Sequence, residues 1–244
     1  MKSGKLEPIV LYEDADIVAV NKPAGLVVHS DGKTLEPNLS EWFLQRNPES
    51  KDVGEPGFTV DGKPVLRPGI VHRLDRETSG VILLAKTPGG FQHVKKQFQE
   101  HTIQKEYHTF VYGEMKTKKG VIDRPIGRSA QDFRKWSAQR GSKGERREAV
   151  TEYTVVGVNM GYSFVHAHPI TGRTHQIRVH FKAINYPVVA DSLYAPHHTN
   201  TLGFERLALH SYSITFTNLH GESKIVTAPY PLDFEHTLKT FTLK

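Results

Sequence analysis

The sequence contains no cysteine, and this absence excludes several kinds of structure and chemistry. A chain without thiols forms no disulfide, binds no zinc or iron–sulfur cluster through cysteine, and uses no thiol nucleophile. Long apolar runs are also missing: the longest, Val81 to Ala85, has five residues, whereas about 20 are needed to span a bilayer. The first residues, Met1 to Pro8, lack the apolar segment of a signal peptide. These absences predict a cytoplasmic protein without a membrane segment.

Three motifs of catalysis and nucleotide binding are absent as well. The chain has no Gly-x-Ser-x-Gly nucleophile elbow, no Gly-x-x-x-x-Gly-Lys-Ser/Thr phosphate loop and no Gly-x-Gly-x-x-Gly turn. Tryptophan occurs only twice, and nothing else suggests sugar binding. The remaining picture is ordinary for a globular protein: 244 residues, 37% hydrophobic and 24% charged. This length suits one large domain or two small ones.

Positive charge is concentrated in one segment. The chain has 32 basic and 26 acidic residues, a net charge of +6. Residues 124–147 hold eight basic and two acidic residues and therefore account for the whole excess. The basic residues are Arg124, Arg128, Arg134, Lys135, Arg140, Lys143, Arg146 and Arg147. Such a stretch indicates contact with a polyanion such as nucleic acid, and a solvated, mobile loop is the alternative.

The hydrophobic pattern predicts an α+β fold. Runs of apolar or alternating residues, typical of strands, occur at 17–20, 26–28, 81–86, 107–112, 150–158, 162–168, 207–216 and 224–227. Apolar spacings of three and four predict helices over 89–101 and 174–185, the second capped by Thr174. Most strands follow one another through short turns. We therefore expect a mixed, largely antiparallel sheet flanked by helices and loops.

A polar run at residues 72–80 is the first candidate for a site of chemistry. Asp75 stands between Arg73 and Arg76, and neighbouring guanidinium groups lower the pKa of a carboxyl and keep it ionised. Such an aspartate suits a nucleophile, or a group that stabilises a cation. A salt bridge within a loop is the alternative. Asp75 and Glu77 could also form the carboxylate pair of a glycoside hydrolase.

Two further segments carry candidate residues. In the predicted helix, Thr174, Arg178 and Lys182 recur at intervals of four, with His175 beside them. Such a helix could contact phosphates or pair an arginine with a buried carboxylate, or simply present a solvated face. Tyr107 begins a strand pattern and could be a core residue or a platform on which a base stacks.

A metal site is not expected. His166 and His168 alternate onto one strand face and could ligate an ion together with His175 or Asp191. The chain has 14 histidines, however, so such coincidences arise easily. The sequence therefore predicts no metal.

At the segment 72–80, His-Arg-Leu-Asp-Arg-Glu-Thr-Ser-Gly, the chain resembles the signature of the RluA-type RNA pseudouridine synthases. Further blocks similar to the family follow its order. They are Asn21 to His29, Arg67 to Val71, Gln104 to Tyr107 with Gly113, Arg124 to Arg128, Glu148 to Tyr153 and Gly172 to His180. The resemblance spans about residues 9–232 and implies a single catalytic domain over 1–244. Many relatives carry an S4-type RNA-binding domain before it, for which we expect no room here.

The resemblance also implies the reaction, the partners and the residue roles. A uridine in rRNA or tRNA is isomerised to pseudouridine, which needs no cofactor and no metal, in an active-site cleft in the middle of the sheet. Asp75 is implied as the catalytic aspartate, Tyr107 as the residue that stacks on the target base, and Arg178 as the partner of the aspartate. Arg73 is implied to fill the space that a flipped base leaves. The other expected RNA contacts are Arg76, Arg128, Arg134, Lys135, Trp136, Arg173 and His175.

A monomer is expected. Two other functions stay open at this point: an RNA-binding protein that has lost catalysis, and a nucleoside or glycoside hydrolase that uses Asp75 and Glu77.

Overall fold

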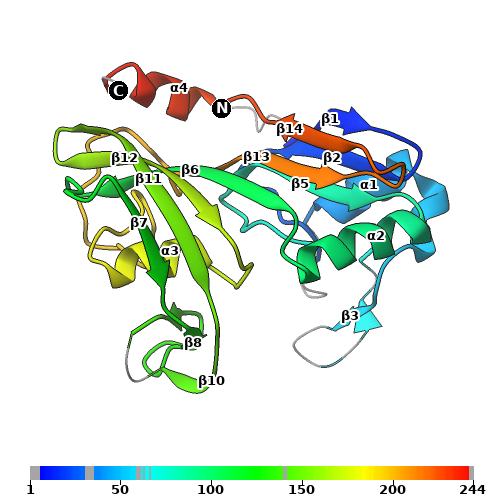
Figure 1. Cartoon of the computed structure of the whole chain (residues 1–244), viewed down its shortest axis with the longest axis horizontal. Helices are drawn as coiled ribbons and strands as arrows, with labels where there is room; N and C mark the ends of the chain where they lie inside the picture. Colours follow the sequence, from blue (N-terminus) through cyan, green and yellow to red (C-terminus); the bar gives the residue numbers. More distant parts are fainter. Residues whose placement is uncertain are drawn as a thin grey trace. The chain divides into compact units, whose positions relative to one another are not determined.

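The computed structural model divides the chain into two compact units (Figure 1). Unit 1 comprises Met1–Gln104 and Ser211–Pro229, and unit 2 comprises Lys105–His210 and Tyr230–Lys244. The structure describes residues 6–30, 36–58, 62, 64–65, 67–139 and 142–241. Within these ranges no helix is long and apolar enough to cross a membrane.

Unit 1 is built on the strands β1 (Ile9–Glu13), β2 (Ile17–Lys22), β5 (Ser79–Ala85) and β13 (Leu209–Thr217), in that order, with β14 (Ser223–Thr227) beside β13. β13 begins in unit 2 and continues in unit 1. β2 pairs with both β1 and β5 in antiparallel ladders. Every side chain of β5 is buried, as its continuous apolar sequence predicts.

The helices of unit 1 are α1 (Leu39–Arg46) and α2 (Pro88–Gln99). A 3-10 helix, Pro48–Asp52, follows α1, and the short strands β3 (Gly57–Phe58) and β4 (Pro64–Val65) pair with each other. The helix predicted over 89–101 is confirmed and begins one residue earlier, at Pro88; its N-cap is Thr87, which accepts a hydrogen bond from the amide of Gly90 at 3.1 Å. Val94 of α2 packs into the same buried cluster as Ile17, Val81 and Phe216.

The strand predicted at residues 26–28 does not form, and only an isolated parallel bridge joins Val27 to Asn38. The carbonyls of this segment have other partners. Those of Val27 and Val28 accept hydrogen bonds from the first amides of α1, at Leu39 and Ser40, and so satisfy donors that a helix start leaves open. Apolar side chains alone therefore identified a buried segment but not its backbone pairing.

Unit 2 is built on an antiparallel sheet in the order β6 (Gln104–Tyr112), β12 (Tyr162–Pro169), β11 (Val150–Asn159) and β7 (Lys119–Asp123). A two-residue turn connects β11 and β12, since Asn159 pairs directly with Tyr162. Met160 and Gly161 both have positive φ, 53° and 81°, as in the mirror-image turns that suit hairpins. The predicted hairpin is confirmed with a turn one residue shorter than expected.

The two faces of this sheet are covered by different helices. Ile177 and Phe181 of α3 (Gln176–Ala183) pack with Val111 and Val165 on one face, and Tyr107 borders this cluster. Phe234 of α4 (Leu232–Leu238) packs on the other face. The alternation of β6 thus places Tyr107 on the α3 side.

α3 itself differs from the prediction in two ways. Its N-cap is His175, in the left-handed conformation with φ 56°, and not Thr174. The helix is also buried almost all round, because Arg178 is 9% exposed and His180 is inaccessible. A solvated face, one of the alternatives stated for this helix, is therefore wrong.

The basic segment forms a small antiparallel sheet of its own. Its strands are β8 (Ile126–Arg128), β9 (Trp136–Ser137) and β10 (Lys143–Arg147). Figure 1 shows β8 and β10 beyond the ends of β7 and β11. Arg140 lies outside the described residues. The expected α+β class with a mainly antiparallel sheet is confirmed, whereas the single-domain organisation stays a prediction.

Candidate functional site

The loop that carries Asp75 is fixed by backbone and buried-lysine contacts within unit 1. Asp75 is half-buried, and its carbonyl accepts a hydrogen bond from the amide of Thr78 at 3.1 Å. The next carbonyl, that of Arg76, accepts from the amide of Gly25 at 2.8 Å and from Nζ of Lys22 at 3.0 Å. Lys22 is fully buried and also donates to the carbonyls of Pro23 at 3.0 Å and Leu26 at 2.8 Å. The block Asn21 to His29, which contains Lys22 and Gly25, therefore supports the backbone at Asp75.

The residues on either side of Asp75 are anchored in different ways. Arg76 donates from both terminal nitrogens to the carboxylate of Glu36, in a bidentate ion pair. His72 accepts the amide of Leu83 at Nε2, 2.9 Å away, and its ring lies 4.5 Å from that of Phe98. Arg73 is exposed. Glu36, which sequence reasoning did not single out, is thus the carboxylate that pairs with one of the two arginines flanking Asp75.

Gly80, at the end of the same signature, is required by backbone packing. Its φ is 107°, and a Cβ placed there would lie 2.1 Å from the carbonyl oxygen of Ser211. Only glycine allows β5 and β13 to approach this closely. The last residue of the signature therefore has a structural role.

Arg178 is held in unit 2 by a buried carboxylate. Its Nε donates to Oδ2 of Asp191 at 2.7 Å, and its Nη2 donates to Oδ1 at 2.8 Å. The side chain of Arg178 is 11% exposed and that of Asp191 is inaccessible. Oδ1 of Asp191 also accepts the amides of Leu193 and Tyr194, each at 3.0 Å. The expected pairing of this arginine with a buried carboxylate is confirmed, with Asp191 as that carboxylate; the pairing of Arg178 with Asp75 stays a prediction.

Tyr194 brings three of the predicted residues together. Its ring lies 5.0 Å from the guanidinium carbon of Arg178, a distance suited to a cation–π contact. Its hydroxyl accepts the backbone amide of Trp136 at 2.9 Å and bonds Nδ1 of His175 at 2.9 Å. Tyr194 thereby fixes His175, whose left-handed backbone is otherwise costly. Sequence reasoning considered Asp191 only as a possible metal ligand and missed Tyr194, although an aspartate at the end of the apolar run from Val188 is a signal for a buried acceptor.

Tyr107 lies where both of its predicted roles are open to it. It is half-buried and packs at the border of the cluster that contains Ile177 and Phe181. Lys105, two residues earlier on the same side of β6, donates from Nζ to the carbonyl of Thr171 at 3.1 Å. Burial lowers the pKa of Lys105 to about 8. The titratable amine of Lys105 and the phenol of Tyr107 therefore lie on the same side of β6, the side that α3 covers.

On the opposite face of β6, Glu106, His108 and His166 form a hydrogen-bonded cluster. Oε1 of Glu106 lies 2.9 Å from Nε2 of His108 and 3.1 Å from Nδ1 of His166. Nδ1 of His108 is bonded to the hydroxyl of Tyr230. Burial above all lowers the pKa of His108 to about 3, so this ring is neutral at pH 7.

Among the described residues, these three come nearest to the spacing of metal ligands. The two imidazoles are stacked, however, with centroids 3.7 Å apart and an angle of 11° between their planes. A metal ion lies close to the plane of each imidazole that binds it, so two stacked rings direct their lone pairs past a common point. The cluster is best described as a hydrogen-bond network. His175 and Asp191, with which the sequence grouped His166 and His168, are not part of this cluster.

The basic segment contributes cations and aromatic rings. Arg128 lies over the indole of Trp136, 4.3 Å from its centroid, and Arg134 donates to Asp132 at 2.9 and 3.1 Å. Phe133 between them is 82% exposed, and sequence reasoning did not single it out. Arg173 is bonded to the residue that directly follows this segment, because its Nε donates to the carbonyl of Glu148 at 3.0 Å.

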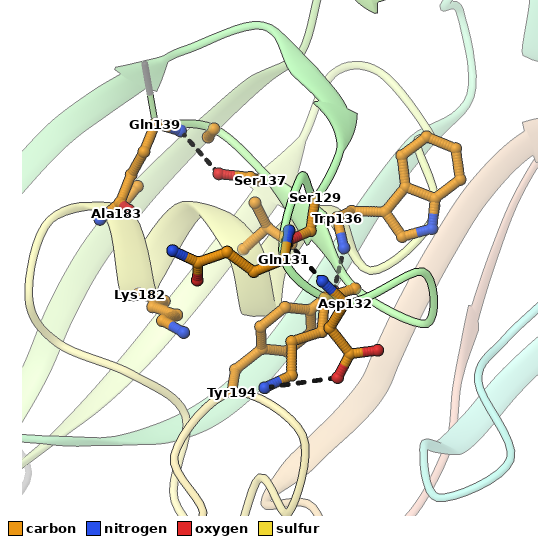
Figure 2. A pocket seen from close by; sticks show the side chains of 12 residues that line it. Ser129, Gln131, Asp132, Trp136, Ser137, Gln139, Lys182, Ala183 and Tyr194 are labelled. Atoms are coloured by element: carbon orange, nitrogen blue, oxygen red, sulfur yellow. Dashed lines mark hydrogen bonds and ion pairs between the residues drawn. The ribbon is translucent and has the colours of Figure 1, made fainter. Parts of the chain in front are cut away.

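Between this segment and α3 the surface is hollowed into a pocket (Figure 2). Lys135, Trp136 and Tyr194 line the pocket, together with Lys182 of α3. In Figure 2 the indole of Trp136 points away from Lys182. The structure thus gathers His175, Arg178, Trp136 and Lys135 of the predicted residues around Tyr194 and this pocket.

Comparison with known proteins identifies a family for this chain. The family model described as RNA pseudouridylate synthase matches residues 16–183. An uncharacterized RNA pseudouridine synthase of Synechocystis is 35% identical over 94% of this chain and 67% of its own length. Ribosomal large subunit pseudouridine synthase D of Neisseria meningitidis is 35% identical over 96% of this chain and 61% of its own length. Its counterpart of the same name in Zymomonas mobilis is 32% identical over 94% and 71%.

Solved structures agree in fold. The human RNA pseudouridylate synthase domain containing 4 superposes with a TM-score of 0.73 at 24% identity, covering 96% of this chain and 94% of that one. The human domain containing 1 gives a TM-score of 0.72 at 24% identity, covering 95% and 87%. The resemblance seen in the signature around Asp75 is therefore confirmed, and the chain belongs to the family of RNA pseudouridylate synthases.

Proposed function

We propose that the protein converts specific uridines of a ribosomal RNA to pseudouridine, with Asp75 as the catalytic group. Isomerisation of uridine in RNA is the activity of the family. The observation that carries the finer proposal is that the family match, residues 16–183, contains Asp75, Tyr107 and Arg178 together. Ribosomal RNA is favoured over transfer RNA because relatives more than 30% identical are named for the large ribosomal subunit.

The reaction exchanges one glycosidic bond for another. The bond from N1 of the base to C1′ of the ribose breaks, the base turns, and C5 bonds to C1′, while the proton on C5 leaves and N1 takes up a proton. Uridine and pseudouridine are isomers, so the net change needs no redox partner and no group donor. An ionised Asp75 can attack an electron-poor carbon or accept a proton from the sugar.

Arg178 is assigned the task of keeping that carboxylate charged and aimed. A guanidinium offers donors in a rigid fork that matches a carboxylate. The bond of its Nε and Nη2 to Asp191 restricts the rotation of the guanidinium, which supports a preset orientation. Tyr107 is assigned to stack on the target base, at the border of the α3-side cluster.

The target uridine is expected to leave its helix before it reacts, at a cost of a few kcal/mol. We assign Arg73, which is exposed, to the space that the base vacates. Arg76, Arg128, Arg134, Lys135, Trp136, Arg173 and His175 are assigned to RNA contacts, mainly to phosphates. We also propose that residues 1–244 act as one catalytic domain, because the family match at residues 16–183 runs through both units.

The test is direct. The protein is incubated with transcribed ribosomal and transfer RNA, and pseudouridine is mapped by carbodiimide treatment and primer extension. A stop at a defined uridine of ribosomal RNA, absent with Asp75→Asn, is expected. Binding without any stop would indicate an RNA-binding protein that has lost catalysis, and release of free uracil would indicate a hydrolase.

A further inference from the structure

The pocket between the basic segment and α3 is an open hollow in the surface. It measures about 530 Å³ only when the solvent-open space at its mouth is counted, so a ligand bound here stays partly exposed. One wall comes from residues 129–139, and the other from Val179, Lys182 and Ala183 of α3. Tyr194 contributes the third side and ties the walls together through its bond to the amide of Trp136.

The charge in this pocket is unbalanced towards positive. Lys135 and Lys182 both line it, and Asp132 is the only carboxylate among the lining residues. Asp132 is already engaged by Arg134 at 2.9 Å and lies 3.8 Å from Lys135. Within the described ranges, Lys182 has no carboxylate within 4 Å, and its ammonium lies 5.5 Å from the ring centroid of Tyr194. The charges that act on Lys182 are those of Lys135 and of Asp191, and Asp191 is already paired with Arg178. A partly buried ammonium that forms no ion pair of its own favours an anion beside it.

The polar groups that remain suit a nucleobase. The hydroxyls of Ser129 and Ser137 accept the backbone amides of Gln131 and Gln139, at 3.2 and 3.1 Å. The side-chain amides of these two glutamines form no hydrogen bond with any residue that the structure describes. Each amide offers two donors and one acceptor group, the combination that the edge of a base requires. Figure 2 shows the amide of Gln131 on the side of the pocket where Lys182 lies.

We infer that this pocket receives one unpaired nucleotide of the RNA substrate, with its phosphate on Lys135 and Lys182 and its base edge on Gln131 and Gln139. The inference rests on the proposed function, because it takes RNA as the substrate. Lys182 follows Arg178 by one turn of α3, a rise of about 6 Å, and both cations lie against the ring of Tyr194. The bound nucleotide is therefore a near neighbour of the target uridine in the RNA strand.

The test is binding of free nucleotides to the whole protein, followed by nuclear magnetic resonance of the side-chain amides. Signals of Gln131 and Gln139 are assigned with the variants Gln131→Ala and Gln139→Ala. The four ribonucleoside 5′-monophosphates are titrated separately, with ribose 5-phosphate and inorganic phosphate as reference ligands. We expect both glutamine signals to shift with at least one nucleotide, and more strongly than with either reference ligand.

Variants separate the two parts of the site. Lys182→Gln is expected to weaken nucleotide binding about tenfold, as the loss of one charge-assisted hydrogen bond implies. Lys119→Gln, at an exposed lysine of β7 outside the pocket, is the matched control and leaves binding unchanged. Gln131→Ala is expected to reduce the preference among bases while phosphate still binds.

Three results would overturn the inference. They are the absence of shifts with all four nucleotides, equal shifts with inorganic phosphate alone, and equal affinity for Lys182→Gln and Lys119→Gln. Because this assay needs no turnover, it fails independently of the proposed function: an active pseudouridine synthase whose pocket binds no nucleotide loses only the inference. Nucleotide binding by a protein that modifies no RNA would instead refute the activity.

Discussion

The ion pair between Arg178 and Asp191 predicts a large effect of one isosteric substitution. Asp191 accepts four hydrogen bonds, two from Arg178 and one each from the amides of Leu193 and Tyr194. In Asp191→Asn the remaining carbonyl can still accept the two backbone amides. The new NH₂ group, however, faces the N–H groups of Arg178, and the guanidinium loses its counter-charge.

The magnitude follows from burial. Breaking a buried ion pair by removing one partner costs about 3–5 kcal/mol. Because Arg178 is 11% exposed and retains the ring of Tyr194, we expect the lower end, about 3 kcal/mol. With a urea dependence of about 3 kcal/mol/M for a chain near this size, the unfolding midpoint falls by about 1 M. Turnover on a verified RNA is expected to fall as well, since the orientation of Arg178 is no longer fixed.

The assay is urea unfolding at pH 7, followed by circular dichroism, with single-turnover kinetics on the same preparations. Glu152→Gln, at an exposed carboxylate of β11, is the matched control and should shift the midpoint by less than about 0.2 M. A midpoint for Asp191→Asn that equals that of the control would refute the argument that this pair stabilises the fold. An unchanged single-turnover rate would refute the positioning role of Asp191.

Four further predictions follow from the same structure. Gly80→Ala should cost about 3–5 kcal/mol, because its Cβ would lie 2.1 Å from a backbone oxygen; Gly161→Ala, with φ 81° but open space around it, should cost only about 1 kcal/mol in urea unfolding. The pKa of His108 is lowered to about 3 in the fold, whereas the unfolded chain takes up that proton near pH 6.5. The unfolded state therefore binds more protons, and urea midpoints should fall as pH decreases from about 6.5 towards 3, less steeply in His108→Gln. Asp75→Asn should abolish pseudouridine formation in single-turnover assays while filter binding of RNA persists. Tyr107→Phe should bind RNA like the wild type, and its turnover should drop only if the hydroxyl moves a proton.

A specific result would contradict the predictions for Gly80, His108 and Asp75. Equal losses of stability in the two glycine variants would show that the close approach at Gly80 relaxes at little cost. A pH profile of stability that is the same in His108→Gln as in the wild type would remove that imidazole as its cause. Measurable isomerisation by Asp75→Asn would rule out this carboxylate as the essential group.

Local patterns predicted seven of the strands, all in the larger sheets, and the two helices α2 and α3, because burial leaves a periodic trace in the sequence. β5 is apolar from Val81 to Ala85 and buried at every position. The hairpin of β11 and β12 follows from alternation around a turn that ends in Gly161. α2 follows from Phe91 and Val94 at helical spacing, both of which are buried.

The errors arise where tertiary partners replace the local ones. Val27 and Val28 have the composition of a strand, but their carbonyls bind the start of α1. Thr174 has the chemistry of a helix cap, yet the bond between His175 and Tyr194 sets where α3 begins. A partner 19 residues away along the chain leaves no mark in a window of ten residues.

For the candidate site, the sequence predicted the residues whose type and motif indicate chemistry, such as Arg178. It did not predict the residues that hold those side chains in place. Arg178 is identifiable by its motif, whereas Asp191 is recognised only through the two hydrogen bonds that join it to Arg178. Phe133 was missed for a different reason: an exposed aromatic residue in a basic segment has no periodic neighbours, so only its 82% exposure reveals it.

The buried ammonium of Lys22 acts as a tethered counterpart of a structural potassium ion. It joins three carbonyl oxygens from two separate loops, those of Pro23, Leu26 and Arg76. A diffusible ion would leave such a cage when the ionic strength falls or when a competing ion arrives. A lysine is held by its own chain, so its local concentration is constant. The loop that carries Asp75 therefore stays ordered whatever the salt concentration. The affinity of the protein for RNA phosphates, in contrast, depends strongly on salt.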